Sequence, residues 1–136
     1  MARAGRLTLL LDTHVVIWAA TDEAELTPGE RNAISAAGVP VVSAVAVWET
    51  RLKWNSFHPS GQRKGVIAPE MLLRFVDVIG WTILPLSARH AATQLQVPMA
   101  HRDPFDELLL VQAQVEGLRL LTRDSALRGH PLALFA

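Results

Sequence analysis

Short apolar runs alternate with helix-forming segments along this chain, and this alternation limits the possible folds more than any other feature of the sequence. The first run, Leu7–Leu11, shows no regular polar alternation, which is typical of a strand buried on both faces of a parallel sheet. We expect further strands at residues 39–42, 81–86, 118–121 and 133–135. Strands that alternate with helices predict an α/β fold, with three layers in α/β/α order and a central parallel sheet of about four or five strands.

The helices between these runs begin and end at recognisable residues. Thr27 is followed by Pro28 and, three residues after itself, by Glu30, which is the pattern of a capping box. Asp103 followed by Pro104 predicts the start of a longer helix that ends near residue 117. We expect the remaining helices at 14–20, 44–54, 69–79 and 87–95, and the first capped helix to run to about residue 37.

Length and composition narrow the class of protein. The 136 residues fit one domain spanning the whole chain, 1–136, and they include 13 Lys and Arg, 13 Asp and Glu, and no cysteine. Disulfide scaffolds and zinc–thiolate sites are therefore excluded, and the formal net charge of zero gives no general sign of a nucleic-acid binder. Half of the residues are hydrophobic, which predicts apolar surface for a partner or a homodimer.

The first twenty residues have some features of a signal peptide, because Arg3 and Arg6 precede an apolar stretch. Asp12 and His14 lie inside that stretch, where a charge is costly, and no apolar run approaches the ~18 residues of a membrane span. We therefore expect a soluble, cytoplasmic protein that has no association with a membrane.

Five acidic residues follow apolar runs or begin helices, and they come from four separate stretches of the chain: Asp12, Glu49, Asp103, Asp106 and Asp124. The carboxyl ends of parallel strands meet at one edge of a sheet, so these side chains are expected to share a cleft. Clustered carboxylates repel one another unless a cation joins them, and oxygen ligands favour Mg²⁺ or Mn²⁺. Such a site is suited to the hydrolysis of phosphodiester bonds.

Each acid also has an ordinary structural explanation. Asp12 is the strongest candidate because apolar residues surround it on both sides, and Asp106 lies toward the apolar side of its helix. Asp103 before a proline equally fits a helix cap, and Asp124 could cap a short turn.

Glu49 leaves two interpretations open. Lys53 lies four residues further along the same predicted helix, so a surface ion pair explains Glu49 about as well as a functional role does.

Four segments, taken in order with their spacing, resemble the PIN-domain family, and more narrowly the VapC-type toxins of bacterial toxin–antitoxin pairs. They are Leu10 to His14, Ser43 to Glu49, His101 to Ala113, and Leu120 to Asp124. The resemblance covers nearly the whole chain from about residue 9. It implies a PIN-like fold and a Mg²⁺- or Mn²⁺-dependent endoribonuclease that a cognate VapB-like antitoxin holds inactive.

The resemblance also implies roles for individual residues. Asp12, Glu49, Asp106 and Asp124 correspond to the four catalytic and metal-binding acids of the family. Asp103 belongs to the same local pattern and is either a ligand or the helix cap.

Two further positions bear on the same site. Thr122 resembles the hydroxyl residue that holds a water or a phosphate. The sequence departs from the family at Glu107, where many similar proteins carry a basic residue, and this makes the local charge less favourable to RNA.

Contacts to RNA and to an antitoxin are assigned to residues near these segments. RNA is expected to meet Arg51, Lys53, Arg102 and Arg123, although for any one of them a solvated surface charge is the more common explanation. Trp54 and Phe57 flank a basic loop and are expected to form part of an antitoxin groove.

The histidines and an alternative function remain to be considered. The five histidines share no metal-ligand spacing and receive no site role. The alternative function is a catalytically silent, PIN-like protein-interaction module.

Overall fold

The computed structural model describes residues 9–136, and these residues form a five-stranded parallel sheet. The strands are β1 (Leu9–Leu11), β2 (Val41–Ser43), β3 (Thr82–Leu84), β4 (Arg119–Leu121) and β5 (Ala133–Leu134). Their order across the sheet is β3-β2-β1-β4-β5. The predicted parallel sheet is therefore confirmed, while residues 7 and 8 of the predicted first strand and the basic residues before them lie outside the described part of the chain.

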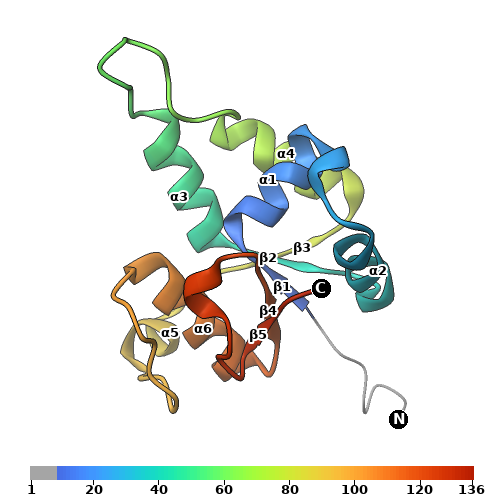
Figure 1. Cartoon of the computed structure of the whole chain (residues 1–136), viewed down its shortest axis with the longest axis vertical. Coiled ribbons are helices and arrows are strands. Elements are labelled where there is room, and N and C mark those ends of the chain that lie inside the picture. Colours follow the sequence, from blue (N-terminus) through green and yellow to red (C-terminus); the bar gives the residue numbers. More distant parts are fainter. Residues whose placement is uncertain (1–8) are drawn as a thin grey trace.

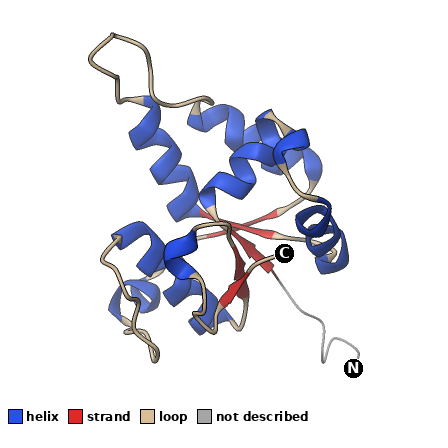
Figure 2. Cartoon of the chain, viewed as in Figure 1, coloured by secondary structure: helices blue, strands red, loops and turns tan. Residues whose placement is uncertain are grey.

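Helices cover both faces of the sheet, which confirms the predicted three-layer α/β/α fold (Figures 1 and 2). The helices are α1 (Thr13–Thr21), α2 (Pro28–Ala37), α3 (Ala44–Trp54), α4 (Pro69–Ile79), α5 (Ala88–Ala92) and α6 (Pro104–Glu116), with short 3₁₀ turns η1 (Glu23–Glu25) and η2 (Ser125–Leu127). Between residues 9 and 136 no helix is both long and apolar enough to span a bilayer.

The predicted helix ends are largely observed. Thr27 and Glu30 form the capping box of α2, and Gly117 takes the left-handed conformation that ends α6. The exception is α5, which ends at Ala92 and not near residue 95. The next residues are held by α6, because the side chain of Gln114 bonds the backbone of Gln94 and Gln96. This tertiary contact keeps the chain extended where the sequence alone suggested another turn of helix.

The strands are buried on both faces because each face has its own apolar core. Leu9 and Leu11 of β1 pack into the core on the side of α1, α3 and α4, while Leu10 packs into the core on the side of α6. All three leucines have no exposed surface. The absence of polar alternation in the sequence of this strand follows from this double burial.

The strand order determines where a site can form. From β1 the chain moves outward through β2 to β3, and then returns to the other side of β1 to build β4 and β5. The order thus reverses between β1 and β4, and ligands of open α/β sheets bind beyond the carboxyl ends of the strands at such a point. Asp12 directly follows β1 and Thr122 directly follows β4.

Candidate active site

Asp12 lies at the reversal point, where three hydrogen bonds hold it. Its Oδ1 accepts a hydrogen bond from the backbone N–H of Thr13 at 2.7 Å, and its Oδ2 accepts one from the hydroxyl of Thr122 at 2.6 Å. Its own backbone N–H donates to the carbonyl of Leu121. Burial raises the pKa of the Asp12 carboxyl above its usual range, although the bonds from Thr122 and Thr13 act against the rise. Asp12 is thus a buried carboxylate with a fixed orientation.

Glu49 reaches the same place from α3. Its Oε1 accepts a 2.7 Å hydrogen bond from the hydroxyl of Thr13, the residue that follows Asp12. The alternative ion pair with Lys53 does not form within residues 9–136. The side chain of Glu49 is therefore oriented by a residue of α1, which is distant in the sequence, and not by a neighbour on its own helix.

Asp106 is the acid whose ionisation the structure perturbs most clearly. It lies in the first turn of α6, is 7% exposed, and burial raises its pKa to about 7. A hydrogen bond of 3.0 Å from Nε2 of His101 opposes this rise. The negative charges of Asp12, Asp103 and Asp124 raise the pKa further, which shows that these four acids share one electrostatic environment.

Asp124 completes the cluster from the segment after β4. Its backbone N–H donates to the Thr122 hydroxyl at 3.0 Å, and its Oδ1 caps η2 through the N–H of Ala126. The turn-capping alternative is thus observed. The same carboxylate lies near Asp106 and His101, since ligand atoms of all three residues fall within 4.8 Å of one another.

Asp103 forms the helix cap that the sequence left open as one of two roles. Its Oδ1 accepts hydrogen bonds from the backbone N–H groups of Phe105 at 2.9 Å and Asp106 at 3.3 Å. Its charge also contributes to the raised pKa of Asp106, so capping does not separate Asp103 from the acidic cluster.

These groups fit a hard divalent cation. The donors are carboxylate oxygens from separate elements. The pKa of Asp106 is about 7 mainly because the carboxyl is buried, and the negative charges of the neighbouring acids add to the rise. Asp106, Asp124 and His101, whose ligand atoms lie within 4.8 Å of one another, could hold such an ion, and Asp12 shares the electrostatic environment of Asp106. An added positive charge would allow all of these acids to remain ionised.

The four basic residues expected to contact RNA are not gathered in one place. Arg51 and Lys53 line two different cavities of about 400 and 360 Å³, and Arg102 lines a third of about 760 Å³ together with Glu107.

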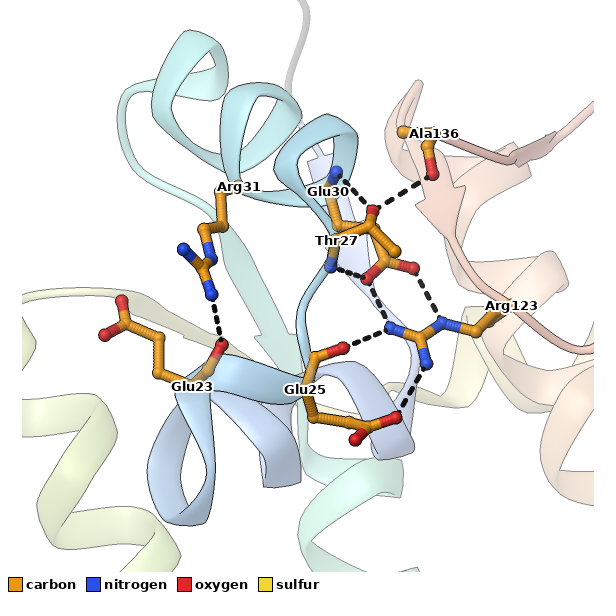
Figure 3. Close-up of polar contacts among 7 residues, drawn as sticks. All are labelled: Glu23, Glu25, Thr27, Glu30, Arg31, Arg123 and Ala136. Carbon is orange, nitrogen blue, oxygen red and sulfur yellow. Dashed lines mark hydrogen bonds and ion pairs between the residues drawn. The ribbon is translucent and has the colours of Figure 1, made fainter.

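Arg123 is held by carboxylates of η1 and α2 (Figure 3). Its guanidinium bonds both oxygens of the buried Glu30, at 2.6 and 2.9 Å, and also contacts Glu25. It lies 4.1 Å from the centre of the Trp18 ring. Most of its donors are thus engaged within the protein.

Trp54 and Phe57, the residues expected in an antitoxin groove, are packed by a neighbour from the same loop. The guanidinium of Arg63 lies 4.1 Å from the centre of the Trp54 ring and 4.7 Å from that of Phe57, and it donates a hydrogen bond to the Trp54 carbonyl. Phe57 remains 50% exposed. The two rings therefore form one unit with Arg63.

Sequence reasoning missed His101. It bonds Asp106 through Nε2, and its Nδ1 is buried without a hydrogen-bond partner in the described part of the chain. The five histidines share no metal-ligand spacing with one another, but the neighbours of this ring are the carboxylates of Asp106 and Asp124. Its position five residues before Asp106, across the proline that starts α6, was the available signal.

The fold and the site define a class of α/β protein with clustered acids at the switch point of a parallel sheet. A family model of the PIN domain matches residues 9–130, so the chain belongs to the PIN-domain family, and the resemblance drawn from its motifs is confirmed. Ribonuclease VapC22 from Mycobacterium tuberculosis (strain ATCC 25618 / H37Rv) is 29% identical over 134 residues, covering 90% of this chain and 92% of that protein.

Two solved structures share the fold. The crystal structure of VapBC2 from Rickettsia felis, bound to a DNA fragment from the promoter, superimposes with a TM-score of 0.60 at 12% identity, covering 96% of this chain and 98% of the other. A toxin–antitoxin complex from Klebsiella pneumoniae gives a TM-score of 0.61 at 18% identity, covering 93% and 96%. At these identities the likeness concerns the fold.

Proposed function

We propose that this chain is a metal-dependent endoribonuclease toxin that cleaves RNA phosphodiester bonds and is neutralised by a cognate VapB-like antitoxin. The observation that carries the proposal is the convergence of acids from separate elements on one point of the sheet, where Asp106 has a pKa of about 7. The similarity to Ribonuclease VapC22 supports RNA as the substrate, and the two toxin–antitoxin structures support an antitoxin as the partner. We further propose that the protein is cytoplasmic and forms a homodimer.

The cofactor in this proposal is Mg²⁺ or Mn²⁺, bound by Asp12, Asp106 and Asp124 with help from Glu49 and Asp103. Such an ion orients a phosphate, lowers the pKa of a water molecule and stabilises the leaving oxygen. No side-chain nucleophile is needed for this hydrolysis.

The protein's own groups prepare the site. Thr122 fixes one oxygen of Asp12, and Thr13 fixes one oxygen of Glu49, so neither carboxylate has to be reoriented when substrate arrives. His101 donates to Asp106 and thereby limits the rotation of that carboxyl. The Thr122 hydroxyl contacts both Asp12 and the backbone of Asp124, and these contacts support the proposal that it positions a water or a phosphate oxygen.

Cleavage of total RNA by the purified, antitoxin-free protein tests the proposal. With Mn²⁺ or Mg²⁺ we expect cuts at discrete sites that disappear with EDTA and in Asp12→Asn. An exposed carboxylate on α4 provides the matched control, since Asp77→Asn should cut as the wild type does. A folded wild type that neither cuts RNA nor is stabilised by either metal would contradict the proposal and favour the silent interaction module.

A further inference from the structure

A cleft of about 360 Å³ opens beside the acidic site, between α1, the end of α3 and the segment 64–67. Its apolar walls include Ile17 and Trp18 of α1 and Ile67 of the segment. Two lysines, Lys53 of α3 and Lys64 of the segment, also line it. The cleft is within the usual size range of small-ligand sites, and it offers both apolar contact and positive charge.

The cleft is next to the acids. A second cavity of about 390 Å³ is lined by Asp12 and Asp124, and its lining includes His14 and Trp18, which also line the cleft. One face of α1 therefore borders both spaces. Because an α-helix rises 1.5 Å per residue, Trp18 lies about 9 Å along the helix axis from Asp12. A strand whose phosphate lies at the acids can thus reach the cleft with its next nucleotides.

Local packing holds the two lysines at the same cleft. A Cβ atom at Gly65 would lie 2.7 Å from Cα of Trp54, so only glycine lets this segment lie against the end of α3. The backbone N–H of Lys64 bonds the carbonyl of Ser56 at 2.9 Å, and Arg63 bonds the carbonyl of Trp54. The loop 55–66, which the sequence marks only by its composition, is therefore shaped to bring Lys64 to the helix that carries Lys53.

The charge of the cleft selects an anion. Asp22 is the one carboxylate in its lining, against Lys53 and Lys64. The adjoining cavity has Asp12 and Asp124 in its lining together with Arg123, whose guanidinium is already bonded to Glu30 and Glu25. A metal-loaded acidic site would bind the phosphate that is cut, whereas the lysines would bind a neighbouring phosphate. The apolar wall is suited to a base or a ribose, which a free phosphate would leave without contact.

We infer that this cleft binds a nucleotide of the single-stranded RNA substrate next to the cleaved phosphodiester, with its phosphate held by Lys53 and Lys64. The inference rests on the proposed function. It adds the path of the RNA over the protein surface, which runs from the acids along α1 to the end of α3. The path does not include Arg102, which lines a different cavity together with His101 and Glu107.

Binding of a fluorescein-labelled single-stranded RNA by the full chain in EDTA tests the inference without cleavage. Lys53→Ala/Lys64→Ala should weaken binding at least tenfold, and the slope of log K against log salt should become shallower by about 1.4, at about 0.7 for each lost phosphate contact. Arg74→Ala/Arg89→Ala removes the same charge from exposed positions on α4 and α5 and should leave the slope unchanged. Equal slopes for the two double variants would overturn the inference.

Gly65→Ala separates position from charge, because it keeps every lysine but forces the segment away from α3. It should weaken RNA binding several-fold at unchanged net charge. If the lysine variant binds RNA as the wild type does while Mn²⁺-dependent cleavage persists, the cleft belongs to another partner and the nuclease function stands. A wild type that neither binds nor cuts RNA would overturn both.

Discussion

Removing the Asp106 charge should stabilise the metal-free protein in basic solution. Asp106 has a pKa of about 7 in the folded chain, against an ordinary value of 3.8 for an aspartate side chain. A raised folded-state pKa means that ionised Asp106 disfavours folding; the penalty is absent below pH 3.8, grows as the pH rises, and is complete above about pH 7. At 1.36 kcal/mol per pKa unit, it reaches about 4 kcal/mol at pH 8 and about 2 kcal/mol at pH 5.

Urea denaturation in EDTA measures this effect. Asp106→Asn has the shape of the protonated acid, so its free energy of unfolding should exceed that of the wild type by up to about 4 kcal/mol at pH 8 and by less at pH 5. Asp77→Asn, at an exposed site on α4, controls for the chemistry of the substitution. An Asp106→Asn advantage that is equal at both pH values, or absent at pH 8, would refute the reasoning.

Metal should narrow this difference in stability at pH 8. Mn²⁺ at 100 times its dissociation constant stabilises a binding-competent fold by about 2.7 kcal/mol. The wild type should gain this amount at pH 8, while Asp106→Asn, which lacks one of the proposed ligands, should gain little. A gain of equal size in both proteins would remove Asp106 from the metal site.

Three further predictions concern the residues that hold the site. Thr122→Val leaves Oδ2 of Asp12 without its 2.6 Å donor and should cost about 1–3 kcal/mol of unfolding free energy at pH 7, measured by urea denaturation, with a weaker Mn²⁺ affinity by calorimetry; unchanged values of both would argue against the role of the hydroxyl. Arg123→Met leaves the buried Glu30 without its bidentate partner and should cost about 1–3 kcal/mol at pH 7. The loss should shrink as the pH falls, because Arg123 lowers the pKa of Glu30 and protonation removes the benefit of the pair; a loss independent of pH would contradict this. Asp103→Ser keeps a capping oxygen and should preserve the Tm within the error of a thermal scan, whereas Asp103→Ala should cost about 1 kcal/mol; if Asp103→Ser nevertheless loses Mn²⁺ affinity, Asp103 is a ligand as well as a cap.

Much of the fold could be read from the sequence because its signals are local. Helix starts such as Thr27 with Glu30, and helix ends such as Gly117, depend on residues within one turn of each other. The apolar run of β1 reflects burial on both faces, which is a property of the strand itself. The predicted α5 is too long because the end of this helix is set by contacts with Gln114, which is about twenty residues further along the sequence.

The candidate site divides in the same way. Asp12 and Asp106 could be identified from an acid placed among apolar neighbours, since burying a carboxylate without a partner or ligand is costly. The bond between Glu49 and Thr13 spans 36 positions, and the histidine at Asp106 was not expected at all. These contacts depend on which strands and helices become neighbours in the fold. The spacing of side chains within one helix does not predict which elements those are.

The sequence by itself thus determined the alternation of strands and helices, the helix caps and the set of acids, because propensity and burial act over a few residues. Only the tertiary structure decided how those acids are used. The Thr122 hydroxyl bonds Asp12 across 110 positions because β4 pairs with β1. Arg123, one residue further, meets Glu30 and Glu25 for the same reason, and Lys64 reaches the cleft only because Gly65 packs on α3. Long-range pairing fixes these positions, so residues of the same type acquire different roles.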